Sequence, residues 1–193
     1  SGIALAAAIP NAQLAWEGYN QLSPLENPIT VWTEASTNSI FAGDANSNYR
    51  KIALCYLGQS QLAAQLYDAA ITSFNTSLPL GGEPSFSLAA RLGLADAYVG
   101  KSDFTSALAQ LTGTTAAELT KKADVLLKQR KAVDAGNALV SPCSDFSLVN
   151  MRAQRQKLID VATMINKLAI SSQGKAFTGP GVLTLRSEEH TSE

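Results

Sequence analysis

Few residues in this sequence are of the types that carry out acid–base, nucleophilic or metal chemistry. The 193 residues include one histidine, His190, and two cysteines, Cys55 and Cys143. No P-loop, dinucleotide-binding glycine pattern, nucleophile elbow or zinc-protease motif is present. Cys55 has apolar neighbours at helical spacing and is predicted to be a small core residue, whereas Cys143 lies in a predicted loop. Nothing in the sequence places the two thiols together, so a disulfide between them stays open.

Two short stretches contain fragments of ligand-binding loops. Asp44, Asn46 and Asn48 have the spacing that opens a calcium loop, but the required glycine is missing and Cys55 stands at the twelfth position instead of glutamate. We interpret this stretch as a helix cap. The sequence Gly100-Lys101-Ser102 lacks the upstream glycine of a phosphate loop. We therefore expect no catalytic residue, no metal site and no cofactor, and we expect that the protein is not an enzyme.

The last eight residues, 186–193, read RSEEHTSE and resemble the in-frame translation of a sequencing-library adapter. We expect this segment to be an artefact and exclude it from fold reasoning. His190 would then not be a native residue. Without it the chain has no histidine for a Ser-His-Asp triad, a Cys-His pair or most zinc sites, which strengthens the expectation of a non-enzymatic protein.

The first thirteen residues, Ser1–Gln13, form a short run of small and apolar side chains that is broken at Pro10. This run is typical of the end of a secretory signal peptide, although a basic segment before it is missing. That interpretation predicts an exported or cell-envelope protein. The alternative is that Ser1–Gln13 begins the first helix, which predicts a cytoplasmic protein.

Composition and charge narrow the class of protein further. The chain is 46% hydrophobic and 16% charged with a net charge of -1, which excludes a collagen, a wholly disordered tail and a globally basic nucleic-acid binder. No nucleic-acid partner is therefore expected. No apolar run approaches the roughly 18 residues that a transmembrane helix needs. The chain is long enough to bury a core of its own.

The small net charge conceals a difference between the two halves. Residues 1–115 contain four basic and eight acidic side chains, whereas residues 116–185 contain ten basic and five acidic ones. One interpretation is two unevenly charged solvated surfaces. A second is head-to-tail association, in which the acidic front of one copy meets the basic back of another. A third is binding of nucleic acid or anionic lipid by the basic side chains Lys121, Lys122, Lys128, Arg130 and Lys131.

Apolar residues recur at helical spacing along most of the chain, and almost no strand pattern is present. Asn27-Pro28 predicts a helix start, with the asparagine as cap and the proline in the first turn. The predicted helices span residues 11–22, 27–41, 49–64, 67–78, 86–100, 103–111, 115–139 and 147–170.

Two pairs of these helices carry the same residue pattern. In each pair a large and a small residue stand next to each other in the first helix, and the second helix opens with an aromatic residue. A small residue follows three positions later and a large one four positions after that. The residues of the pattern are Leu57, Gly58, Tyr67, Ala70 and Phe74, then Leu94, Ala95, Tyr98, Phe104, Ala107 and Leu111. The small residues allow close approach of two helices, and the large ones fill the grooves between them.

Both windows resemble tetratricopeptide repeats, and together they cover about residues 51–114. Ala70 and Ala107 are equivalent and lie 37 residues apart, against a family period of about 34. The extra residues fit in the loop Pro79–Pro84.

The first window departs from the family pattern, because Gln61 replaces the usual tyrosine and Gln65 replaces the usual turn glycine. A third repeat does not follow in register, since Ser141-Pro142 falls where its small residue should be.

The resemblance implies an all-α fold with tetratricopeptide-like hairpins stacked as a short solenoid over residues 14–114. A long antiparallel helical hairpin is expected over residues 115–171. Residues 172–185 are predicted to be a Gly/Pro-rich linker or the start of a truncated segment.

The expected function is non-catalytic: a protein–protein interaction or assembly module that binds another protein or associates with itself head to tail. By analogy with the repeat family, the groove of the solenoid would be lined by Ile52, Gln59, Ala89 and Asp96. This surface lacks the clustered Lys and Arg that would predict capture of a carboxylate.

A second function rests on two early tryptophans, Trp16 and Trp32. They are interpreted as cover for the first helices, or alternatively as rings that stack on a sugar. The second interpretation predicts an exported glycan-binding protein of the SusD-like type, which resembles this chain only in its general helical build.

Overall fold

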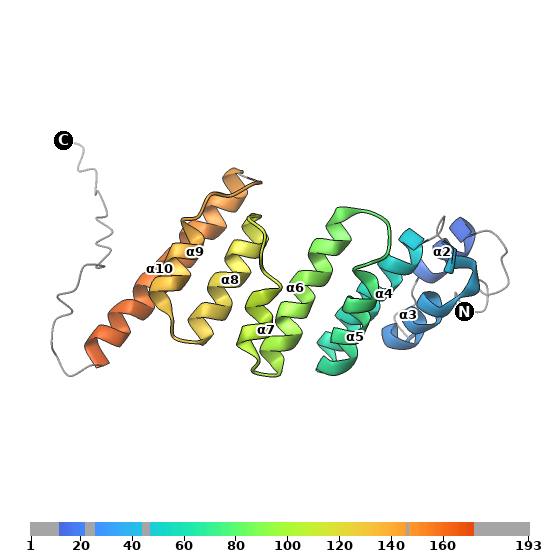
Figure 1. Cartoon of the computed structure of the whole chain (residues 1–193), viewed down its shortest axis with the longest axis horizontal. Helices are drawn as coiled ribbons and strands as arrows, with labels where there is room; N and C mark the ends of the chain where they lie inside the picture. Colours follow the sequence, from blue (N-terminus) through green and yellow to red (C-terminus); the bar gives the residue numbers. More distant parts are fainter. Residues whose placement is uncertain (1–11, 22–25, 44–46, 146, 172–193) are drawn as a thin grey trace. The chain divides into compact units, whose positions relative to one another are not determined.

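The computed structural model describes residues 12–21, 26–43, 47–145 and 147–171, and every regular element within them is helical (Figure 1). The all-α fold class predicted from the sequence is therefore confirmed. Four of the predictions concern residues outside these ranges, wholly or almost wholly: the N-terminal run, the start of the calcium-like loop, the 172–185 segment and the adapter-like tail.

The chain forms two compact units, Ser1–Thr112 and Gly113–Glu193. The described helices of the first unit are α2 (Ala12–Asn20), α3 (Pro28–Thr37), the 3-10 helix η1 (Ser39–Phe41), α4 (Ser47–Ala63), α5 (Tyr67–Ser77), α6 (Pro84–Gly100) and α7 (Phe104–Ala109). Those of the second unit are α8 (Ala116–Lys128), α9 (Ala132–Leu139) and α10 (Leu148–Ser171).

Helix α3 begins where the sequence predicts. The Asn27 side chain accepts a hydrogen bond from the backbone N–H of Ile29 at 3.0 Å, and Pro28 occupies the first turn, where its missing N–H costs nothing. Asn38 then ends α3 and caps η1 by accepting from the backbone N–H of Ile40 at 3.0 Å. Two asparagine side chains thus cap the two helices that precede α4.

Consecutive helices of the first unit pack against each other as hairpins. Helix α4 packs on α5, α6 packs on α7, and α6 also packs on both α4 and α5, so the second hairpin stacks on the first. Within this part of the chain the helices run side by side, as Figure 1 shows.

The ring of Phe74 on α5 joins the two hairpins. An ideal Cβ atom on Gly58 of α4 would lie 2.7 Å from Phe74 Cε1, and one on Gly93 of α6 would lie 2.4 Å from Phe74 Cζ. Phe74 is fully buried in one cluster with Cys55, Ala70, Ala90, Leu94 and Ala97. The absence of a side chain at two glycines therefore makes room for one large ring between three helices.

The three predicted packing alanines, Ala70, Ala95 and Ala107, are completely buried. The large apolar residues Leu57, Leu94 and Leu111 of the same pattern are also buried. The aromatic residues Tyr67, Tyr98 and Phe104 are half-buried. Tyr67 lies against the last residue of α6, because a Cβ atom on Gly100 would stand 2.3 Å from its Cε1 atom.

The turn between α4 and α5 has the same backbone geometry as the turn between α6 and α7. Gln65 and Ser102 have φ angles of 60° and 62°, in the left-handed region. The next N–H groups, of Leu66 and Asp103, donate back over the turn to the carbonyls of Gln61 and Tyr98 at 2.8 and 2.9 Å. Both are Schellman turns, in which a non-glycine residue takes the strained position.

The prediction of one continuous helix over residues 115–139 is wrong, because the chain forms two helices there. Arg130 has a φ of 61°, and the N–H of Lys131 donates to the carbonyl of Leu126 at 2.9 Å, so the same turn occurs a third time. The described part of the second unit therefore contains three helices rather than one long hairpin. Ala135 takes the buried small position that the sequence pattern had placed at Ser141-Pro142.

The start of α8 is held by side chains from its own first turn and from the loop after α9. The Thr115 hydroxyl oxygen accepts from the Glu118 N–H at 3.2 Å and its O–H donates to Glu118 Oε2 at 2.8 Å. Asp145 Oδ1 accepts from the Ala116 N–H at 2.7 Å. Three of the first amide groups of the unit, including that of Gly113 on Glu118, are thus satisfied.

Helix α10 packs on both α8 and α9. Lys157 Nζ donates to Asp124 Oδ1 at 2.6 Å, which ties α10 to α8 and raises the pKa of Lys157. Val161 is buried and faces Gly136 of α9.

Candidate binding surface

The four predicted groove residues lie on the two first helices of the hairpins. Ile52 and Gln59 are seven residues apart on α4, and Ala89 and Asp96 are seven residues apart on α6, so each pair shares one side of its helix. Gln59 is exposed and the other three are half-buried. Helices α4 and α6 pack on each other, and each carries one apolar and one polar position of the predicted groove.

The two predicted aromatic binding residues lie in a network of rings that holds the first helices together. The ring centroid of Trp16 is 5.7 Å from that of Trp32 and 5.6 Å from that of Tyr49, and Trp32 lies 4.8 Å from Tyr56. Trp32 is only 7% exposed, whereas Trp16 is half-buried. Trp32 therefore has little surface for stacking on a sugar, and Trp16 keeps part of one.

Sequence reasoning missed a buried cation. Lys51 on α4 is 3% exposed, and its ammonium group donates to the backbone carbonyl of Leu80 at 3.0 Å and to the Ser87 hydroxyl at 2.7 Å. The lysine thereby fastens the loop between the two hairpins onto α4. A lysine within a polar-looking run carries no sequence signal for burial, because lysine is almost never fully buried.

Cys55 lies one helical turn after Lys51 and is completely buried, as predicted. Its thiol is 3.6 Å from the Ser77 hydroxyl and 3.5 Å from the carbonyl of Phe86. Burial raises the pKa of Cys55, and the Ser77 hydrogen bond and the Lys51 charge oppose this only in part. A raised pKa lowers the fraction of thiolate, so the thiol is a poor nucleophile at neutral pH.

Cys143 is the other free cysteine, in the loop that caps α8. Its thiol donates to Asp145 Oδ1 at 3.1 Å, and this contact with a carboxylate raises the pKa of Cys143. The loop caps the start of α8 through Asp145. The same carboxylate disfavours the thiolate form of Cys143.

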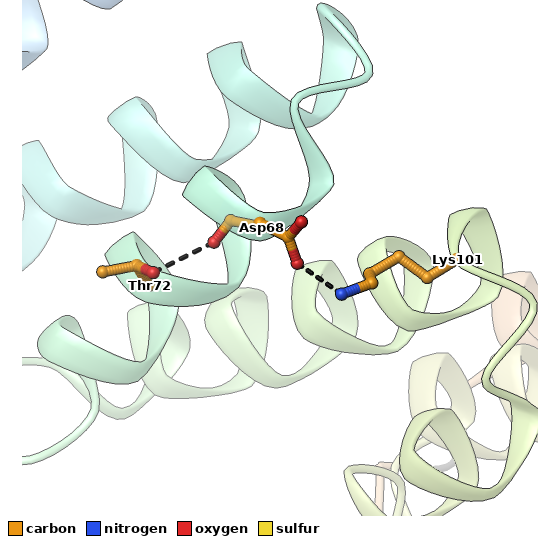
Figure 2. A network of polar contacts seen from close by, with 3 residues as sticks. All are labelled: Asp68, Thr72 and Lys101. Carbon is orange, nitrogen blue, oxygen red and sulfur yellow. Dashed lines mark hydrogen bonds and ion pairs between the residues drawn. The ribbon is translucent and has the colours of Figure 1, made fainter.

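An exposed polar network connects the start of α5 with the end of α6 (Figure 2). The Lys101 ammonium donates to Asp68 Oδ1, and the Thr72 hydroxyl donates to the backbone carbonyl of Asp68 at 3.0 Å. The hydrogen bond that Lys101 donates to Asp68 raises the pKa of Lys101. An exposed ion pair of this kind contributes little to stability, so the network adds only a weak contact between the two hairpins.

Within the described ranges, no three His, Cys, Asp or Glu side chains converge in a way that would hold a metal ion. None of the helices in those ranges is long and apolar enough to cross a lipid bilayer. No protein-family profile matches the chain, and neither a curated protein nor a solved structure matches it.

Proposed function

We propose that the chain is a non-catalytic protein-interaction and assembly module built on tetratricopeptide-like helical hairpins. The observation that carries the proposal is the repeated surface on α4 and α6, where Ile52 and Gln59 on one helix have counterparts in Ala89 and Asp96 on the next. A repeat of the same side-chain positions on stacked helices suits an extended peptide or a helix of a partner better than a small molecule.

The turn geometry supports this proposal. Gln65 and Ser102 adopt the left-handed φ in equivalent turns, and Ala70 and Ala107 are buried at equivalent places after them. Two hairpins with the same turn and the same close contacts present their first helices in the same way. The aromatic network and the buried Cys55 belong to the core, so the exposed or half-buried positions on α4 and α6 form the proposed binding surface.

A displayed library of random peptides tests the proposal. Peptides that bind the wild-type chain are re-measured with Gln59→Lys and Asp96→Lys, and we expect binding to weaken at least about tenfold, because the new charges enter the proposed surface. Asn75→Lys, an exposed position on α5, is the matched control and should leave binding unchanged. Equal binding to all three variants, or no enrichment over an unfolded chain, would contradict the proposal.

The glycan-binding alternative is tested separately with Trp16. A Trp32→Ala substitution would remove core packing as well as a ring, so loss of sugar binding in that variant would be ambiguous. Trp16→Leu removes the half-buried ring and keeps most of its apolar volume. Retention on polysaccharide gels that is lost in Trp16→Leu would favour glycan binding, and no retention of the wild-type chain would count against it.

A further inference from the structure

The first and the last described helices of the chain carry opposite charge. Every charged side chain among the described residues from 12 to 43 is a carboxylate: Glu17, Glu26 and Glu34. Helix α10 carries four basic side chains, Arg152, Arg155, Lys157 and Lys167, against the single carboxylate of Asp160. The difference in charge between the two halves is therefore concentrated at α2–α3 and at α10.

Helix α10 presents part of this charge beside an exposed apolar side chain. Arg152, Arg155 and Ile159 follow each other at steps of three and four residues, which places them on one side of the helix, and Ile159 is 42% exposed. Lys157, which lies on another side, is already paired with Asp124. Among the residues that the structure describes, neither arginine of this face forms an ion pair.

Helix α2 presents a complementary face. Leu14 is 50% exposed, and Glu17 lies three residues further on, exposed on the same side. The Gln13 amide donates to Glu17 Oε1 at 3.3 Å, which holds the carboxylate at the surface of the helix. Each face thus combines one large apolar residue with charge, and the signs of the two charges are opposite.

We propose that the chain associates head to tail, with α10 of one copy packed on α2 of the next. Ile159 meets Leu14, and Arg152 and Arg155 meet Glu17. Two different faces, one on α2 and one on α10, make a heterologous contact, which continues into an open chain of copies unless the geometry closes it into a ring. The inference rests on the assembly part of the proposed function and names its partner, a second copy, on the basis of charge complementarity.

Light scattering of the full chain over a range of concentrations tests this contact. The mean mass should rise with concentration at about 0.01 M salt and fall towards the monomer at about 1 M, because salt screens the pairing of Glu17 with the two arginines. A monomer at every concentration in low salt overturns the inference. Peptide binding through α4 and α6 is measured independently, so loss of self-association leaves that part of the proposed function standing.

Charge reversal at one end distinguishes a head-to-tail contact from a symmetric one. Glu17→Arg blocks the head, the double variant Arg152→Glu with Arg155→Glu blocks the tail, and each is expected to weaken association at least about tenfold. An equal mixture of the two should associate again, because the intact tail of one variant meets the intact head of the other and the two reversed ends again carry opposite charges. If the Glu17→Arg variant still associates like the wild type, the contact is not head to tail.

Two control variants carry the same charge changes elsewhere. Glu83→Arg alters an exposed carboxylate at the N-cap of α6 whose side chain makes no capping hydrogen bond, and the double variant Arg130→Glu with Lys131→Glu alters two exposed cations in the α8–α9 turn. Both should associate like the wild type. All the altered side chains are exposed, so every variant is expected to keep the fold. Thermal unfolding of each variant checks this. Equal loss of association in the controls would overturn the assignment to α2 and α10.

Discussion

The Phe74 ring occupies the place of a side chain on Gly93, since a Cβ atom built there would stand 2.4 Å from the ring's Cζ atom. A Cβ atom on Gly58 of α4 would also meet the ring, at 2.7 Å from Cε1. The ring is completely buried, so a side chain at either glycine would force a shift inside a packed core. The contact between the two hairpins therefore depends on two positions that lack a side chain.

We expect Gly93→Ala to lower the free energy of unfolding by about 1–3 kcal/mol, the usual cost of overpacking a core. The gain of up to about 1 kcal/mol from replacing a helical glycine opposes this only in part. Gly136→Ala in α9 is the control, because its Cβ atom would meet Val161 at 3.5 Å, an ordinary contact. That variant should be more stable than the wild type. Denaturant unfolding of both measures the difference, and a shift in the same direction would contradict the packing argument.

Sequence pattern found one of the two glycines and missed the other. Gly58 belongs to the Leu-Gly pair of the repeat pattern, whereas Gly93 precedes the equivalent Leu94-Ala95 pair and has no place in it. The need for a glycine at 93 comes from a ring on a different helix, which the local pattern does not encode. The buried Lys51 was missed for the same reason, because its acceptors Leu80 and Ser87 lie across a loop.

The division of residues 115–139 into α8 and α9 could also not be predicted from the local sequence pattern. Gln129, Arg130 and Lys131 are good helix formers without glycine or proline, so nothing in their propensity predicts a break. The break is compensated by the burial of Ala135 and Leu139 on α9, which a straight helix would carry away from α8. Packing outweighs propensity here, and the cost appears as a left-handed φ of 61° at Arg130.

We therefore expect Arg130→Gly to raise the stability of the second unit by up to about 1 kcal/mol, because glycine adopts a positive φ without the clash of a Cβ atom. Lys128→Gly, two residues earlier within α8, is the control and should lower stability by a similar amount. The unfolding midpoints of the two variants measure both effects. A continuous helix through residue 130 would make both substitutions destabilising.

Replacement of Lys51 tests the buried cation. Lys51→Met keeps the aliphatic chain and removes the ammonium, so the Leu80 carbonyl and the Ser87 hydroxyl lose a charged donor inside the protein. We expect the free energy of unfolding to fall by about 1–3 kcal/mol. Lys128→Met changes an exposed lysine and should alter stability by no more than about 0.5 kcal/mol. Equal effects of the two substitutions would show that Lys51 contributes only its apolar stem.

The capping of α8 by Asp145 predicts a specific dependence of stability on pH. The hydrogen bond from the Ala116 N–H, with that from the Cys143 thiol, lowers the pKa of Asp145 below its ordinary value. A carboxylate whose pKa is lower in the folded state stabilises the fold above its unfolded pKa of about 3.9, and this contribution disappears as the pH falls through the folded pKa.

Asp145→Asn removes the charge while keeping an amide oxygen near the Ala116 N–H. We expect the variant to unfold at a lower temperature than the wild type at pH 7, because a carboxylate at a helix start also interacts with the helix dipole. The gap between the two melting temperatures should narrow as the pH falls below about 4, because the carboxylate takes up its proton first in the unfolded chain and then, at lower pH, in the folded protein. Glu83→Gln, which alters an exposed carboxylate without a capping bond, controls for the change in net charge. A gap for Asp145→Asn that stays constant from pH 7 to acid would mean that the carboxylate charge contributes nothing at the start of α8.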